Sequence, residues 1–224
     1  MPNSPLPTLS LLETRVLGVL VEKQRTVPDT YPLTLNSLVA GCNQKTSRDP
    51  VVNATEAEVQ AAVDHLKTLS LVIESSGGRV MRYAHNVGRV LHVPAESVAL
   101  LAMLMLRGAQ TAGELRINCE RLHKFSDVSS VEGFLNELAE WPAGPLAVEL
   151  PRQPGARENR WVHLLAGTPT PESYATASFA AGSGADVTVG ELAALRANVT
   201  RLEGELASLK ETVSKLCAEL GVSG

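Results

Sequence analysis

The apolar residues of the first part of the chain recur at helical spacing three times and then at strand spacing twice. Leucine and valine return every three or four residues from Ser10 to Gln24, from Leu33 to Cys42 and from Thr55 to Leu69. This period predicts three helices. Two short runs, residues 71–73 and 80–83, flank a Ser-Ser-Gly-Gly turn and predict a β-hairpin.

The same order of elements follows a second time. Apolar periodicity predicts helices over Pro94–Leu106, Thr111–Leu122 and Ser129–Trp141. Strand-like runs at residues 146–150 and 160–165 then flank a loop rich in proline and glycine, which predicts a second hairpin. The fold class expected from this order is mainly α with small β-hairpins, that is, α+β.

Residue-by-residue matches relate the two halves. The second helix of each half carries a T-x3-L-x3-C pattern, formed by Thr34, Leu38 and Cys42 in the first half and by Thr111, Leu115 and Cys119 in the second. Capping boxes mark four helix starts, at Ser10 with Glu13, Thr55 with Glu58, Thr111 with Glu114 and Ser129 with Glu132. Three helices followed by a hairpin is the winged-helix arrangement, an elaborated helix-turn-helix. We therefore predict two tandem winged-helix domains, residues 8–90 and 91–166.

The C-terminal part of the chain has a different pattern. Residues 167–187 are rich in proline, alanine, serine and glycine and predict a flexible linker. Residues 188–221 then carry an uninterrupted a/d heptad pattern at Leu192, Leu195, Val199, Leu202, Leu206, Leu209, Val213, Leu216 and Leu220. Leucine at every d position and valine at alternate a positions favour a parallel two-stranded coiled coil, and hence a homodimer. The alternative is that this helix folds back onto its own domains.

Composition and charge narrow the class of protein. The chain has 224 residues, of which 44% are hydrophobic and 20% are charged, with a net charge of −4. These values are typical of a soluble protein of one large or two small domains. The longest apolar run, from Val98 to Leu106, is too short for a bilayer span, and the N-terminus lacks the features of a signal peptide. We expect a cytoplasmic protein without a membrane partner.

Five segments resemble the bacterial YceH family. They are YPLTLNSLVA (residues 31–40), GCNQKTSRDPV (41–51), LRGAQTAGELR (106–116), ERLHKF (120–125) and LPRQPG (150–155). The resemblance covers roughly residues 8–166 and implies two winged-helix domains. It implies no activity, substrate or catalytic residue, and the coiled-coil segment lies outside it.

The sequence offers little for catalysis. No two of the five histidines lie at helical spacing from each other, and His123 alone has a cysteine, Cys119, close in sequence. Nucleophile, phosphate-loop and metalloprotease motifs are missing. Cys42 and Cys119 occupy equivalent positions on apolar helix faces, which favours core packing over redox or metal sensing. We therefore predict no enzyme activity, cofactor or metal site.

DNA binding is the common use of this fold, but the third helices are acidic. The first of them carries Glu56, Glu58 and Asp64 against Lys67, and the second carries three glutamates and no cation. Acidic groups repel phosphates, whose neutralisation supplies much of the affinity for DNA. The candidate contacts therefore lie in loops and wings, at Lys45, Arg48, Arg79, Arg82, Arg116, Arg152 and Arg157. We predict a regulator of transcription that contacts double-stranded DNA through these residues.

The alternative function is a scaffold for protein partners without direct DNA binding. In that case the aromatic residues Tyr83, Phe125, Trp141 and Trp161 are candidate anchors, although the two tryptophans are more typical of a core in a chain so poor in aromatic residues. The salt dependence of binding distinguishes the two functions. The affinity for DNA falls steeply as the salt concentration rises, whereas the affinity at a protein interface of ordinary polarity does not.

Overall fold

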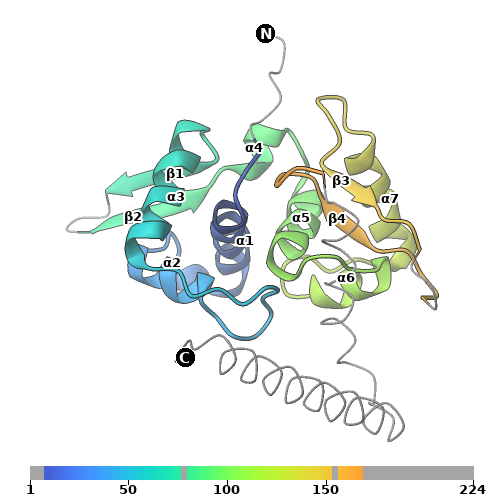
Figure 1. The fold of residues 1–224 in the computed structure, drawn as a ribbon, viewed down its shortest axis with the longest axis horizontal. Coiled ribbons are helices and arrows are strands. Elements are labelled where there is room, and N and C mark those ends of the chain that lie inside the picture. The colour runs from blue at the N-terminus through green and yellow to red at the C-terminus, as the bar shows by residue number, and fades with distance from the viewer. Residues whose placement is uncertain (1–7, 77–79, 153–155, 169–224) are drawn as a thin grey trace, which may run out of the picture. The chain divides into compact units, whose positions relative to one another are not determined.

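The computed structural model describes residues 8–76, 80–152 and 156–168, which contain two runs of three α-helices and a hairpin together with two shorter helices (Figure 1). Helices predominate and both sheets are antiparallel pairs, so the α+β class is confirmed. All described residues fall within one compact unit that spans residues 1–177. The coiled-coil prediction for residues 188–221, most of the linker and Arg79 lie outside the described residues.

The first half contains three α-helices, one short 3-10 helix and one hairpin. Its elements are α1 (Leu11–Thr26), η1 (Pro28–Thr30), α2 (Leu35–Cys42), α3 (Glu56–Thr68), β1 (Val72–Ser76) and β2 (Met81–His85). The predicted caps are confirmed, since Ser10 and Thr55 form complete capping boxes at α1 and α3. Thr34 accepts a hydrogen bond from the Ser37 backbone at the start of α2.

The second half repeats this order after a short connecting helix. Its elements are α4 (Val87–Leu91), α5 (Ala95–Arg107), α6 (Ala112–Asn118), α7 (Val128–Ala139), β3 (Ala147–Glu149) and β4 (Trp161–His163). The pattern did not predict α4, because five residues are too few to show a helical period.

The predicted capping box of Ser129 and Glu132 is wrong. The N-cap of helix α7 lies two residues earlier, at Asp127, whose Oδ1 accepts a 2.7 Å hydrogen bond from the Ser130 backbone. Aspartate is as effective an N-cap as serine, and its charge interacts favourably with the helix dipole, so the earlier start is preferred.

Each hairpin gains a third backbone partner from the residue two positions before the second helix of its half. Leu33 pairs with Tyr83 in β2, with N···O distances of 3.0 and 2.8 Å. Gln110 pairs with Trp161 in β4, at 3.1 and 2.7 Å. Because the two bridges occupy equivalent places before α2 and α6, the repeat extends beyond the order of elements to the hydrogen bonding of the backbone.

Helices α1 and α5 lie side by side at the centre of the described residues (Figure 1). Each is buried around its circumference over residues 13–21 and 97–106, a length of roughly two and a half turns. Gly18 permits their close approach, because a Cβ atom there would lie 2.8 Å from Cγ of Leu106. A single hydrophobic cluster contains residues from both halves. The predicted domain boundary at residues 90 and 91 stays a prediction.

Candidate nucleic-acid interface

The third helix of each half presents carboxylates to solvent. On α3, Glu56, Glu58 and Asp64 are exposed, as the capping and apolar positions of this helix require. The ammonium group of Lys67, on the same helix, contacts the carboxylate of Glu74 and lies 3.5 Å from that of Asp64. The one lysine of α3 is therefore already compensated.

Helix α7 is equally acidic. Glu132 and Glu137 are exposed along it, Glu140 is exposed at its C-cap, and its sequence contains no lysine or arginine. Val131, Leu135 and Leu138 are fully buried on the opposite face. A negative outer face of this kind repels the phosphates of a duplex, so neither third helix is suited to enter the major groove.

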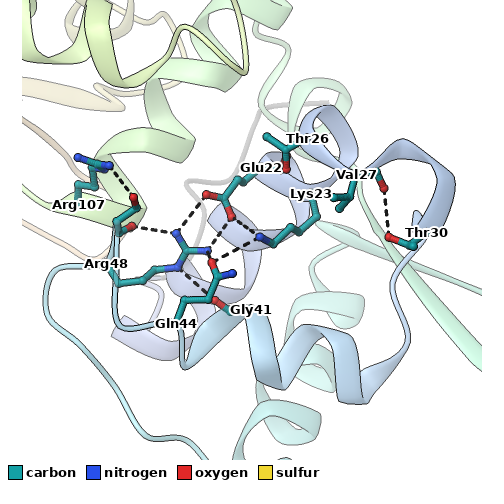
Figure 2. A network of polar contacts seen from close by, with 10 residues as sticks. Glu22, Lys23, Thr26, Val27, Thr30, Gly41, Gln44, Arg48 and Arg107 are labelled. Atoms are coloured by element: carbon teal, nitrogen blue, oxygen red, sulfur yellow. Dashed lines mark hydrogen bonds and ion pairs between the residues drawn. The ribbon is translucent and has the colours of Figure 1, made fainter.

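The loop between α2 and α3 contains two of the predicted contact residues, and their side chains differ in exposure. Lys45 is exposed, whereas the side chain of Arg48 is fully buried. The Arg48 guanidinium binds both carboxylate oxygens of Glu22, at 3.2 and 2.6 Å, and donates to Oε1 of Gln44 at 2.7 Å (Figure 2). Its Nε donates to the Gly41 carbonyl at 3.2 Å. Arg48 therefore holds the loop onto α1 and has no group left to offer to DNA.

The electrostatics of this ion pair follow from its burial. Burial alone would raise the pKa of the Glu22 carboxyl, but the hydrogen bonds and the charge of Arg48 outweigh it and leave the pKa below its ordinary value. Lys23, 3.2 Å from the same carboxylate, acts in the same direction. Glu22 is therefore ionised at neutral pH and compensated within the protein.

Arg107 is a structural residue that the sequence analysis did not single out. Its guanidinium donates to Oγ of Ser47 at 2.6 Å and to Oδ1 of Asn118 in α6 at 3.0 Å. The backbone N–H of Asp49 also donates to the Leu106 carbonyl at 2.8 Å. These contacts hold the Lys45 loop against the end of α5 and next to α6, which carries Arg116. No local signal predicts them, because the partners lie 60 and 11 residues from Arg107.

Two further candidates are engaged by backbone carbonyls. Arg82, on β2, is half-buried and donates to the carbonyls of Thr30 and Pro32 at 3.3 and 2.8 Å. It therefore anchors the η1 segment to the hairpin. Arg116 is exposed and makes one 3.3 Å hydrogen bond to the Ser126 carbonyl, so most of its guanidinium faces solvent.

The connection between β3 and β4 carries exposed positive charge. Arg152 and Arg157 are both exposed and make no hydrogen bond or ion pair with the described residues. Arg160, next to β4, differs from them, because it donates to the Ala109 carbonyl at 2.7 Å and pairs with Glu114 at 3.0 Å. Among the seven predicted contacts, Lys45, Arg116, Arg152 and Arg157 are therefore the described residues whose charge faces outward.

Desolvation disfavours the charged forms of Cys42, Cys119 and His163. Cys42 and Cys119 are fully buried, and burial raises the pKa of each thiol to about 12. Burial lowers the pKa of His163 to about 4. Across residues 8–76, 80–152 and 156–168, no group of three histidine, cysteine, aspartate or glutamate side chains could hold a metal ion.

The aromatic residues considered as protein-binding anchors belong to the core. Tyr83, Phe125 and Trp161 are buried. Trp141 is half-buried, and its Nε1 donates to the Leu91 carbonyl at 3.1 Å, which ties the end of α7 to α4. Burial makes packing the role of Tyr83, Phe125 and Trp161 in this fold.

Comparisons with known proteins identify the family. The family model described as "Protein of unknown function, DUF480" matches residues 9–156. The chain belongs to this family. The resemblance to the YceH family is thereby confirmed.

Close relatives carry the name UPF0502 protein. One from Methylibium petroleiphilum is 61% identical over 224 residues, which cover 98% of this chain and 93% of the relative. One from Dechloromonas aromatica is 60% identical over 197 residues, which cover 88% of this chain and 90% of the relative. One from Leptothrix cholodnii is 63% identical over 192 residues, or 84% and 85% of the two chains. These names give no activity. Within the described residues, no helix is both long and apolar enough to cross a membrane.

Proposed function

We propose that this chain is a non-enzymatic DNA-binding protein of the winged-helix type that acts in transcriptional regulation. Two features of the fold support the proposal. Each half has three helices and a hairpin in the winged-helix order. In each half, the residue two positions before the second helix also pairs with the second strand of the hairpin, at Leu33 and at Gln110.

The observation that carries the proposal is the exposed charge of the second wing. Arg152 and Arg157 lie on the same β3–β4 connection and have no partner among the described residues. Lys45 and Arg116 supply further outward charge on neighbouring elements. Because both third helices are acidic, the proposed contact uses wings and loops, and its affinity comes mainly from phosphates.

The test is the binding of duplex DNA of mixed sequence to the full chain, measured by fluorescence anisotropy from about 50 to about 200 mM salt. Replacing Arg152 and Arg157 together with alanine should weaken binding and reduce the slope of log K against log salt by about 0.9 for each lost phosphate contact. Lys67→Ala is the matched control, because that lysine is already paired with Glu74, and it should leave binding unchanged. A dominant effect of Lys67→Ala would contradict the wing proposal.

Replacing Arg82, on the first hairpin, would be a poorer test. Arg82 holds the Thr30 and Pro32 carbonyls, so its removal would disturb the fold as well as any DNA contact. Arg152 and Arg157 avoid this difficulty, because no hydrogen bond within the described residues depends on them.

The proposal includes a homodimer formed by the heptads of residues 188–221. A dimer would present two copies of each wing, the arrangement that a two-fold symmetric DNA site requires. Sedimentation equilibrium should find a dimer for the full chain and a monomer for a chain ending at Gly167. A full-length monomer at micromolar concentration would contradict the coiled coil, and a dimer that survives the truncation would place the interface elsewhere.

A second candidate function is a scaffold for a basic protein partner. The exposed carboxylates of α3 and α7 favour it, because they form acidic faces without compensating cations on α7. The same binding experiment separates the two functions. Absence of duplex binding even at about 50 mM salt, where phosphate contacts are strongest, would exclude direct DNA binding and favour the scaffold.

A further inference from the structure

A pocket of about 450 Å³ opens between the end of α1, the β1–β2 hairpin, α4 and α5. Its apolar wall is formed by Val21, Ile73, Val93, Val98, Ala99 and Leu122. Residues from both halves of the chain therefore contribute. The volume lies within the range of about 300–1,000 Å³ that is typical of small-molecule sites, and a mainly apolar lining with a few polar groups is typical of them too.

The charged groups at this pocket are all positive. Arg25, in the last turn of α1, and Arg89, on α4, both line it and are both exposed. Neither makes a hydrogen bond or ion pair with the described residues, and no aspartate or glutamate lines the pocket. An uncompensated pair of guanidinium groups beside an apolar wall favours a ligand with an anionic head and an apolar body.

The remaining polar wall is neutral. His85 Nε2 lies 2.8 Å from Oε1 of Gln24, and burial together with the charge of Arg25 lowers the pKa of this histidine to about 4. Asn86 donates to the Ser70 carbonyl at 3.0 Å. These two side chains are held by the protein, so the charge available to a ligand at neutral pH is that of Arg25 and Arg89.

We infer that this pocket binds a small organic carboxylate with a hydrocarbon body, with the carboxylate at Arg25 and Arg89 and the hydrocarbon against Val21, Val98 and Ala99. The inference does not depend on DNA binding. The pocket is lined in part by the first hairpin and by α4, the helix that connects the two halves. If the chain binds DNA, a ligand in the pocket would therefore lie next to the first hairpin and be placed to affect its contacts.

The test compares octanoate, octan-1-ol and octylammonium, which share one hydrocarbon body and differ in the charge of the head. Isothermal titration calorimetry with the full chain should find saturable, one-to-one binding of octanoate, tighter by about tenfold than that of the other two compounds. The double variant Arg25→Ala/Arg89→Ala should remove this preference. Ala95→Trp, which adds a large aromatic side chain to the lining of the pocket, should abolish binding of all three.

Controls separate the pocket from general effects. Arg152→Ala/Arg157→Ala makes the same change of net charge away from the pocket and should leave octanoate binding unchanged, and thermal melting checks that each variant is folded. Equal affinity for the three compounds, no saturable binding, or octanoate binding that survives the loss of Arg25 and Arg89 would each overturn the inference. Octanoate binding that weakens as protein concentration rises would show that a second copy covers the pocket, and would overturn it as well.

Discussion

The buried ion pair between Arg48 and Glu22 should stabilise the fold strongly. Arg48→Met removes a guanidinium whose side chain is fully buried and leaves the Glu22 carboxylate, 14% exposed, without its bidentate partner. Breaking a buried pair from one side costs about 3–5 kcal/mol. Lys23, 3.2 Å from the same carboxylate, remains. We therefore expect a loss of about 3 kcal/mol in the free energy of unfolding, the lower end of this range.

Urea denaturation of the full chain, followed by circular dichroism, measures this loss. The double variant Glu22→Leu/Arg48→Met should be more stable than Arg48→Met alone, because it leaves no unpaired carboxylate, although the Gly41 and Ser47 carbonyls still lose a donor at about 1 kcal/mol each. Lys45→Met, in the same loop but exposed, is the control and should change stability by less than about 0.5 kcal/mol.

The loss should also depend on pH. The pKa of Glu22 is lower in the folded protein than in the unfolded chain, where a glutamate titrates near about 4.3. Its contribution to stability is therefore complete above that value and disappears as the pH falls through the folded pKa. The difference between the wild type and Arg48→Met should be largest at neutral pH and shrink below about pH 4. A neutral-pH loss under about 1 kcal/mol, or a loss independent of pH, would refute the reasoning.

Two further predictions concern packing. Gly18→Ala should lower the free energy of unfolding by about 1–3 kcal/mol through overpacking of α1 against α5. Gly133→Ala, on α7 with no atom within 4 Å of the new Cβ, should instead raise it by about 0.5–1 kcal/mol; thermal melts with the same sign for both would contradict the close approach. The second prediction concerns Cys42 and Cys119 and uses a chain in which the third cysteine, Cys217, is replaced by serine. Both remaining thiols should react with a disulfide reagent in denaturant but not in the native protein, because both are buried with a pKa of about 12. Rapid labelling of the native protein would show that the helices open.

The sequence by itself determined the elements and their order. Capping boxes such as those at Ser10, Thr55 and Thr111 join residues three positions apart. The interaction that starts each of these helices can therefore be recognised from neighbouring residues of the sequence. The hairpins were predictable for a similar reason, because a turn and its flanking strands are contiguous. Local competition also explains the one wrong cap, since Asp127 and Ser129 are both good N-caps and the helix began at the earlier one.

The candidate site was predictable only in part, because the sequence shows a charge but not its partner. Lys45, Arg152 and Arg157 are exposed, and their contact with DNA stays a prediction. Arg48 looked like them in sequence, yet its partner Glu22 lies 26 residues away. The pocket that Arg25 and Arg89 line could likewise not be predicted from the sequence, because its walls come from both halves of the chain. Tertiary packing decides which cations are buried in ion pairs and which remain free, since desolvation and pairing depend on distance in space and not on distance along the chain.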